Sequence, residues 1–148
     1  MSLIYSMEFD ASFRISDVVD RLDTVPGFKL ADGTVSAQDL EIFTHIREPS
    51  DLKCQVIEES FFFHPSVVVS FRLNALGDRF AGRHRIIQAT LTLLECSSGD
   101  AVLLFNGETV MFQRLDGRLT LNRVEGFWTS EALDMVPRPY ECDEIPII

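Results

Sequence analysis

Two tight-turn sequences constrain this chain more than any other feature. Asn106-Gly107 and Asp116-Gly117 each lie between short runs of apolar residues, within the segment 99–128. Asn-Gly and Asp-Gly favour two-residue hairpin turns, because both residues tolerate the positive φ that such turns require. We therefore predict three antiparallel strands in this segment, joined by two hairpins.

The two turns also predict how the three strands pair. Centring the second turn places Phe112 opposite Leu121, and centring the first places Leu103 opposite Val110. Because side chains alternate between the two faces of a strand, both registers put the same apolar residues on one face. That predicted face consists of Ala101, Leu103, Phe105, Val110, Phe112, Leu119 and Leu121.

Hydrophobic spacing predicts the remaining elements. A long helix before Gly99 is indicated by an apolar stripe at helical spacing, and shorter helices are expected after Ser16 and after Thr129. The segment 28–36 is expected to be a connection with a turn at Asp32-Gly33. The long stripe is formed by Leu76, Phe80, Ile87, Leu91 and Leu94. Alternating patterns predict strands at residues 3–9, 39–47, 53–63 and 66–73.

The predicted order of elements is β-α-βββ-α-βββ-α. Short connections favour antiparallel neighbours, so we expect an α+β fold with a strongly bent, mostly antiparallel sheet of about seven strands. Helices should cover one face of this sheet. The 148 residues, 46% of them hydrophobic, fit a single domain, 1–148, with one core.

The net charge narrows the classes of partner, and the cysteines and the hydropathy pattern indicate the compartment. The net charge of −10 argues against binding to nucleic acid or to an anionic membrane, and it permits attraction to a basic protein. Cys54, Cys96 and Cys142 lie far apart, which favours reduced thiols. The chain shows no leader-like or membrane-spanning apolar run, so we expect a cytoplasmic protein.

The residues that could carry chemistry are scattered. His45, His64 and His84 occur singly, and a Cys54/His64 pair lacks the further ligands of a recognised zinc site. No nucleophile motif and no glycine-rich phosphate loop occurs. We therefore expect no metal site, no cofactor and no catalytic residue.

One acidic residue leaves an alternative open. Glu59 lies among apolar residues of the predicted strand 53–63, whereas Glu58 should point to the opposite face. A buried acid there would suggest an enzyme or ligand-binding pocket between the sheet and the long helix, near Glu59, Arg72 and His84. An edge position or an ion pair with Arg72 would explain Glu59 without a pocket.

Several segments together resemble a known family. They read MSLIYSMEF, VVVSFRLN, GDAVLLFNGETVMFQRLDGRLTLN and GFWTSEALDMVPRPYE. In this order and spacing they are similar to the immunity proteins of bacterial Sit-type toxin–immunity systems, third type. The resemblance implies a cytoplasmic protein that binds and neutralises a cognate polymorphic toxin, and it supplies no catalytic residue.

Many antibacterial toxin domains are basic nucleases, and an acidic surface would attract and cover such a partner. The chain could act as a monomer or a homodimer, and a purely structural homodimer joined through a strand edge is a further alternative. The single tryptophan, Trp128, could anchor a partner or close the core over the hairpins. The carboxylates predicted to face the toxin are Asp32, Asp39, Glu131, Asp134, Glu141, Asp143 and Glu144.

Overall fold

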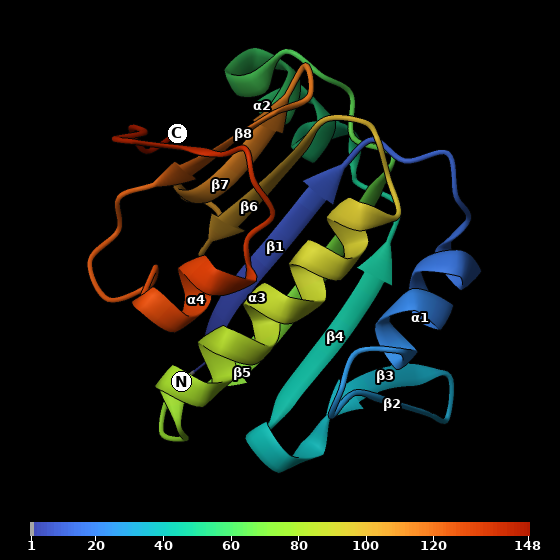
Figure 1. Cartoon of the computed structure of the whole chain (residues 1–148). Coiled ribbons are helices and arrows are strands. Elements are labelled where there is room, and N and C mark those ends of the chain that lie inside the picture. The colour runs from blue at the N-terminus through green and yellow to red at the C-terminus, as the bar shows by residue number, and fades with distance from the viewer. Residues whose placement is uncertain (1) are drawn as a thin grey trace.

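The computed structural model describes residues 2–148, which form one α+β domain built on a single sheet (Figure 1). The helices are α1 (Ile15–Asp23), α2 (Asp51–Phe61), α3 (Arg79–Glu95) and α4 (Ser130–Met135), with a short 3-10 turn at Gln38–Leu40. The strands are β1 (Ser2–Phe9), β2 (Lys29–Ala31), β3 (Thr34–Ala37), β4 (Ile42–Arg47), β5 (Val67–Asn74), β6 (Ala101–Phe105), β7 (Thr109–Leu115), β8 (Arg118–Asn122) and β9 (Glu141–Asp143).

The strands lie in the order β2-β3-β4-β5-β1-β6-β7-β8-β9, nine within the described residues rather than the expected seven or so. Neighbouring strands are antiparallel except β8 and β9, which run parallel. The N-terminal strand β1 sits at the centre, so the first and last parts of the chain are joined by one sheet.

Both faces of the sheet carry helices, which corrects the expectation of one covered face. Helices α1, α3 and α4 cover the face shown in front in Figure 1, where they enclose the main core. Helix α2 lies behind the sheet and closes a smaller core with the strands β6 and β7. That smaller core contains Ile57, Phe61, Phe63, Val102, Leu104 and Val110.

The central hairpins form at both predicted turns. Asn106 and Asp116 have φ values of 51° and 52°, and the glycine that follows each has 78°. The predicted pairing of Phe112 with Leu121 is confirmed. The predicted pairing of Leu103 with Val110 is wrong for two reasons. The first loop spans three residues, 106–108, so Leu104 pairs with Val110, and a bulge then shifts the register again between Leu104 and Leu103.

The longer loop and the bulge together change which side chains share a face. Leu103 pairs with Phe112 and Leu104 pairs with Val110, so Met111 is the extra residue on β7. Val110 therefore turns to the smaller core under α2, whereas Phe112 stays in the main core. The other six residues of the predicted face belong to the main core or pack against it.

Helix α2 replaces the strand predicted at 53–63. Ser50 caps this helix, since its hydroxyl accepts the Lys53 N–H at 3.2 Å. The buried residues Ile57 and Phe61 are four apart, a spacing that satisfies the period of a helix and that of a strand equally. Alternation alone therefore could not separate the two structures.

Two segments that were expected to have no strand contain short ones. The predicted connection 28–36 is the β2–β3 hairpin, turned at Asp32 and Gly33 with φ of 52° and 76°. The acidic tail contains β9, three residues long. The strands expected at 3–9 and 66–73 are confirmed, and the one expected at 39–47 is confirmed from Ile42 onward.

Helix α3 is confirmed, but its apolar stripe begins later than predicted. Leu76 and Phe80 are 88% and 54% exposed, while the residues from Ile86 onward pack against the sheet. Gly82 lies where α3 packs tightly on β5, because a β-carbon there would lie 2.6 Å from Cδ1 of the buried Leu73.

We expect Gly82→Ala to lower the free energy of unfolding by about 1–2 kcal/mol. The crowding against Leu73 should outweigh the roughly 1 kcal/mol gained from better helix propensity. Urea denaturation would measure the change, with Gln88→Ala on the exposed side of α3 as a near-neutral control. A Gly82→Ala protein more stable than the wild type would contradict this close packing.

Candidate functional site

The seven carboxylates predicted to face a partner are all exposed, but they lie at opposite ends of the sheet. Asp32 and Asp39 are near β2 and β3, at one edge. The other five lie on α4, on β9 and directly after β9, at the opposite edge. One compact partner surface can therefore hold at most five of the seven.

Asp39 has a structural contact that explains its position. Both of its carboxylate oxygens accept hydrogen bonds from Arg85 on α3, each at 3.1 Å. These hydrogen bonds hold the pKa of Asp39 below its ordinary value. The pair links α3 to the 3-10 turn before β4, so Asp39 is less free than Asp32 to meet a partner.

At the opposite edge, two polar side chains hold the elements in place: Thr129 before α4 and Asn122 on β8. Thr129 caps α4, since its hydroxyl accepts the Ala132 N–H at 3.1 Å, as predicted from sequence. Asn122, at the end of β8, donates to the carbonyls of Val110 and Ile145 and accepts the Ile145 N–H at 2.9 Å. These bonds hold the C-terminal segment against β8 and place β9 beside it.

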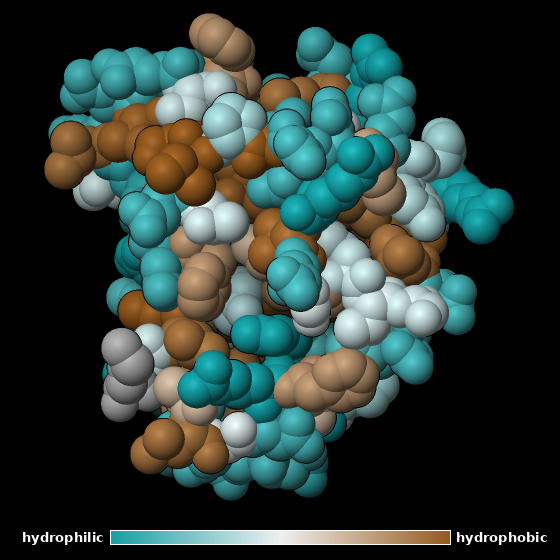
Figure 2. Space-filling model, turned by 90° about the vertical axis from the view of Figure 1, so that its left-hand side faces the viewer, coloured by the Kyte–Doolittle hydropathy of each residue, from teal (hydrophilic) through white to brown (hydrophobic). Residues whose placement is uncertain are grey.

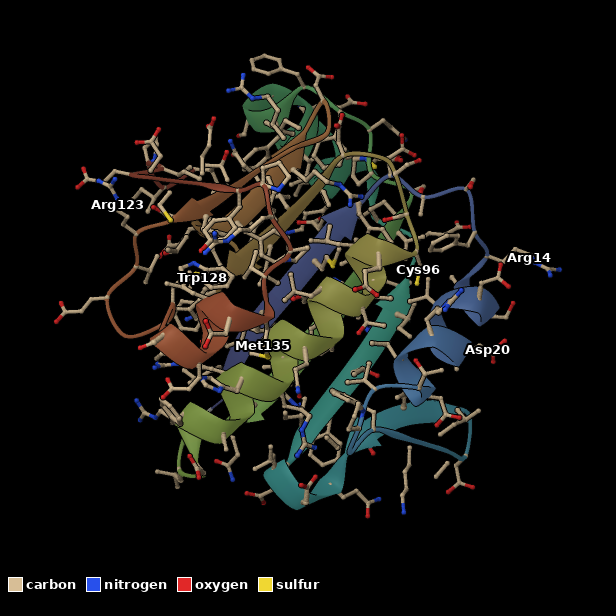
Figure 3. All side chains as sticks on the ribbon, viewed as in Figure 1. Arg14, Asp20, Cys96, Arg123, Trp128 and Met135 are labelled. Atoms are coloured by element: carbon tan, nitrogen blue, oxygen red, sulfur yellow. The ribbon has the colours of Figure 1, made fainter. Side chains whose placement is uncertain are left out.

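A shallow cavity of about 440 Å³ lies at this edge, between β8, the loop after it and α4. Its walls include the apolar side chains of Leu121, Val124, Trp128 and Leu133. Figure 3 shows Trp128 between the sheet and α4, and Arg123 projecting outward. We call this cavity and the α4 and β9 residues around it the C-terminal edge.

Trp128 serves the core and the cavity at once. Its indole Nε1 donates to the Met111 carbonyl at 3.1 Å, and its ring packs against those of Phe112 and Phe127. The side chain is nevertheless only half-buried, and part of it lines the cavity. Both alternatives considered for this tryptophan therefore have a structural basis.

The C-terminal edge is predominantly acidic. Residues 118–148 contain six carboxylates against three arginines. Arg118 is paired with Glu141 at 3.0 Å. Figure 2 views the molecule from this side, where hydrophobic and hydrophilic side chains form small neighbouring patches without one broad apolar face. The six carboxylates are Glu125, Glu131, Asp134, Glu141, Asp143 and Glu144.

The alternative pocket at Glu59, Arg72 and His84 is not assembled. Glu59 is on α2, where it accepts a hydrogen bond from Gln55 at 3.1 Å. Arg72 is on the same side of the sheet but in another part of it, on β5. His84 is on α3, across the sheet, and its Nε2 contacts the Thr129 hydroxyl at 2.9 Å.

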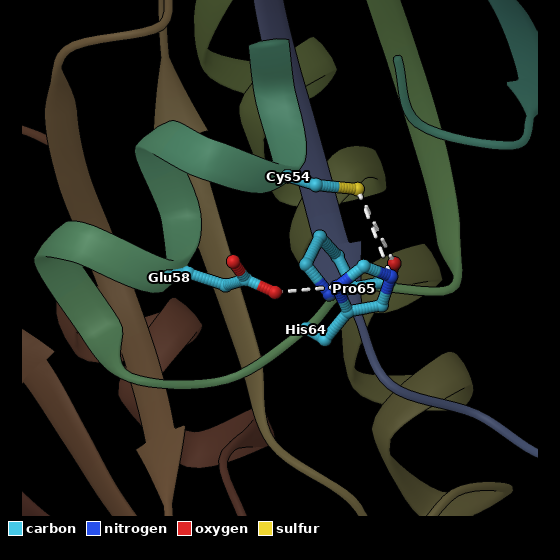
Figure 4. Close-up of polar contacts among 4 residues, drawn as sticks. All are labelled: Cys54, Glu58, His64 and Pro65. Carbon is cyan, nitrogen blue, oxygen red and sulfur yellow. Dashed lines mark hydrogen bonds and ion pairs between the residues drawn. The ribbon is translucent and has the colours of Figure 1, made fainter. Parts of the chain in front are cut away.

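A cysteine and a histidine do come together, at α2 and the turn after it. The Cys54 Sγ lies 3.9 Å from His64 Nε2, and His64 Nδ1 pairs with the Glu58 carboxylate (Figure 4). Sequence spacing raised the Cys54/His64 pair but not its third member. Sequence spacing would have pointed to Glu58 only if 53–63 had been predicted as a helix, because Cys54 and Glu58 are then one turn apart.

The surroundings of Cys54 disfavour a reactive thiolate. Burial, with the nearby carboxylates of Glu58, Asp51 and Glu8, raises the pKa of the Cys54 thiol. Within residues 2–148, no group of three or more histidine, cysteine or acidic side chains is arranged to hold a metal ion. The arrangement therefore acts best as a link between α2 and the turn before β5.

Comparison with known proteins identifies a family. No curated protein and no solved structure matches the chain. Within residues 2–148, no helix is both long and apolar enough to cross a membrane. A family model described as SitI3-like matches residues 3–132, from β1 to the middle of α4, and so includes both central hairpins. The match covers most of the chain and confirms the resemblance to Sit-type immunity proteins, so the chain belongs to the SitI3-like family.

Proposed function

We propose that this chain is an immunity protein that binds one cognate bacterial toxin and neutralises it by covering its active surface. The protein would act in the cytoplasm of the cell that makes the toxin, without catalysis of its own. Membership of the SitI3-like family supports a toxin partner. The observation that carries the binding site is the C-terminal edge, where a cavity with apolar walls lies beside α4 and β9, two elements that carry several carboxylates.

This edge has the parts that a protein interface needs. Affinity in such interfaces comes mostly from a few large side chains that fill pockets, and surrounding charges guide association. The cavity beside Trp128 can take one apolar or aromatic side chain of the partner. The carboxylates of α4 and β9 favour a basic partner, such as a nuclease domain whose phosphate-binding surface they would occupy.

We expect Glu131→Lys combined with Asp134→Lys to weaken toxin binding about 10- to 100-fold, since each reversal turns attraction into repulsion. Titration calorimetry with the C-terminal domain of the toxin encoded beside the gene would measure the dissociation constant. The matched control is Asp20→Lys with Glu95→Lys, which changes the charge equally on exposed parts of α1 and α3. This control should bind within about twofold of the wild type.

The proposed function itself is tested by co-expression. Cells that produce the neighbouring toxin domain should grow when the wild-type chain is present and stop growing when it is absent. Gel filtration should show a complex of the two proteins. If growth is not restored and no complex forms, the chain is not the immunity protein for that toxin.

A further inference from the structure

The face of the sheet behind α3 is only half covered. Helix α2 and Ile145 cover the part formed by β6 and β7. The remaining part, formed by β4, β5 and the start of β1, has an open depression of about 490 Å³. We call this depression the rear groove.

The strand register explains which side chains meet in the rear groove. On β4, every second residue from Phe43 to Arg47 points to this face, and the same holds for β5 and β1. Three rows of paired residues therefore cross the three strands. They are Phe43–Arg72–Ile4, His45–Ser70–Ser6 and Arg47–Val68–Glu8.

Two arginines in these rows have no carboxylate partner. Within residues 2–148, neither Arg47 nor Arg72 forms an ion pair, although the chain has 23 acidic residues and only 13 lysines and arginines. Arg47 donates to the Ser70 hydroxyl at 3.0 Å, and its Nη1 lies 3.5 Å from His45 Nδ1. The Arg72 guanidinium lies 5.8 Å from the centre of the Phe43 ring.

Neither set of contacts brings a carboxylate within ion-pair distance of the guanidinium groups. The carboxylate in the third row, Glu8, is fully buried and lies 3.7 Å from Lys53, and Arg47 also attracts it at longer range. Arg47, Arg72 and Lys53 together outnumber this one carboxylate, so the rear groove is a cationic site in a strongly acidic protein. Phe43 and Ile4, which are 45% and 40% exposed, give one end of it an apolar surface.

We propose that the rear groove binds an extended acidic segment of the toxin. Carboxylates of that segment would pair with Arg47 and Arg72, and an apolar side chain would rest on Phe43 and Ile4. Phe43 and Arg47 are four residues apart on one strand, roughly 13 Å, which four residues of an extended peptide can span. Arginine suits this role because its planar group can bind a carboxylate through two hydrogen bonds.

This inference rests on the proposed function, because it takes the toxin as the partner. A protein segment is favoured over nucleic acid, since the net charge of −10 would repel a phosphate backbone at every other surface. The toxin would then present a basic surface to the C-terminal edge and an acidic segment to the rear groove. Such opposite charges on two surfaces would also help to exclude wrong partners.

The first test replaces the two arginines by neutral residues. We expect Arg47→Gln with Arg72→Gln to weaken binding of the neighbouring toxin domain at least tenfold in titration calorimetry. The matched control, Arg14→Gln with Arg21→Gln, removes the same charge from two exposed positions, one just before α1 and one on it, and should change the affinity less than twofold. Urea denaturation of each variant would show that both remain folded.

The second test identifies the acidic partner directly. Arg47→Lys with Arg72→Lys keeps the charge and adds two amines that a carbodiimide can couple to nearby carboxylates. Mass spectrometry of the cross-linked complex should then show both lysines joined to aspartate or glutamate of one toxin segment. Arg14→Lys with Arg21→Lys should give no such product.

Each outcome decides between the proposals. If no complex forms with the wild-type chain, the proposed function and this inference both fail. If the complex forms and Arg47→Gln with Arg72→Gln binds normally, or if the lysine variant yields no cross-link to the toxin, only the rear-groove inference fails. If the groove arginines instead prove necessary for binding a single-stranded oligonucleotide but not the toxin, the site is a nucleic-acid site and the inference is wrong.

Discussion

Arg114→Met is expected to lower the free energy of unfolding by about 3 kcal/mol, the largest effect of any substitution considered. Arg114, on β7, donates to the carbonyls of Leu94, Ser97 and Gly99 at distances of 2.8 to 3.0 Å. These groups belong to the end of α3 and the turn that leads to β6. One guanidinium therefore holds the longest helix to the central hairpins.

The size of the effect follows from what remains after the substitution. The Leu94 carbonyl would keep the Ser97 N–H at 3.3 Å, but the carbonyls of Ser97 and Gly99 would lose the hydrogen bonds from Arg114. A poorly hydrated carbonyl without a hydrogen bond costs roughly 1–3 kcal/mol. Burial also lowers the pKa of the Arg114 guanidinium, so these carbonyl contacts and nearby Asp100 must offset the cost of burying its charge. Methionine keeps the aliphatic packing but replaces none of the hydrogen bonds.

Urea denaturation at neutral pH would measure this prediction, with Arg118→Met as the control. Arg118 is exposed and pairs only with the exposed Glu141, a kind of ion pair that contributes less than about 1 kcal/mol. Arg114→Lys should be intermediate, because an ammonium group cannot reach three carbonyls with one planar fork. A loss below about 1 kcal/mol for Arg114→Met would show that solvent satisfies these carbonyls.

The second large effect is a gain of stability, expected for Glu8→Gln at neutral pH. Glu8 is fully buried on β1, and neither of its carboxylate oxygens has a hydrogen-bond partner among the described residues. Burial raises the pKa of Glu8 from 4.5 to about 6, although Lys53 partly opposes the change. A shift of this size corresponds to about 2 kcal/mol.

The direction with pH follows from the raised pKa. Below about pH 4.5 Glu8 is protonated in both the folded and the unfolded chain, so it costs nothing as a charge. As the pH rises through about 6, the folded chain must ionise a buried group, and its stability falls relative to that of a neutral variant. Glu8→Gln should therefore match the wild type near pH 4.5 and exceed its free energy of unfolding by about 2 kcal/mol at pH 7.5.

Urea denaturation of both proteins at several pH values would follow this difference. Glu95→Gln, which removes an exposed carboxylate from α3, is the control and should track the wild type throughout. A Glu8→Gln protein less stable than the wild type at pH 7.5 would mean that the carboxylate and Lys53 form a net favourable pair.

The parts of the fold that were predicted correctly depend on residues close together in the sequence. Asn106-Gly107 and Asp116-Gly117 need only their own backbone preferences, and the predicted cap at Thr129 needs only residues up to Ala132. Helix α3 is long enough for its spacing to identify it despite exposed residues at its start. Such signals survive without knowledge of the rest of the chain.

The parts that were missed depend on contacts that sequence spacing cannot show. Helix α2 has its two fully packed positions four residues apart, which fits either type of element. Strands β2 and β9 have three exposed residues each and therefore no apolar alternation to detect. The bulge opposite Leu103 depends on how β7 is shared between two cores.

For the candidate sites, too, the sequence predicted the types of residue but not which of them lie together. Sequence alone identified acidic residues as a class, but only the strand order separates Asp32 and Asp39 from the C-terminal edge. The Asp39–Arg85 contact joins residues 46 positions apart. The rear groove was missed because Arg72 and Arg47 come from different strands, and only their register shows that they share a face.

The two outermost strands, β2 and β9, carry a further consequence because each is only three residues long. Such short edge strands offer few unpaired amide and carbonyl groups to another molecule. This limits the edge-to-edge pairing of sheets that leads to aggregation. Short edge strands of this kind should let the protein reach a high concentration without such association.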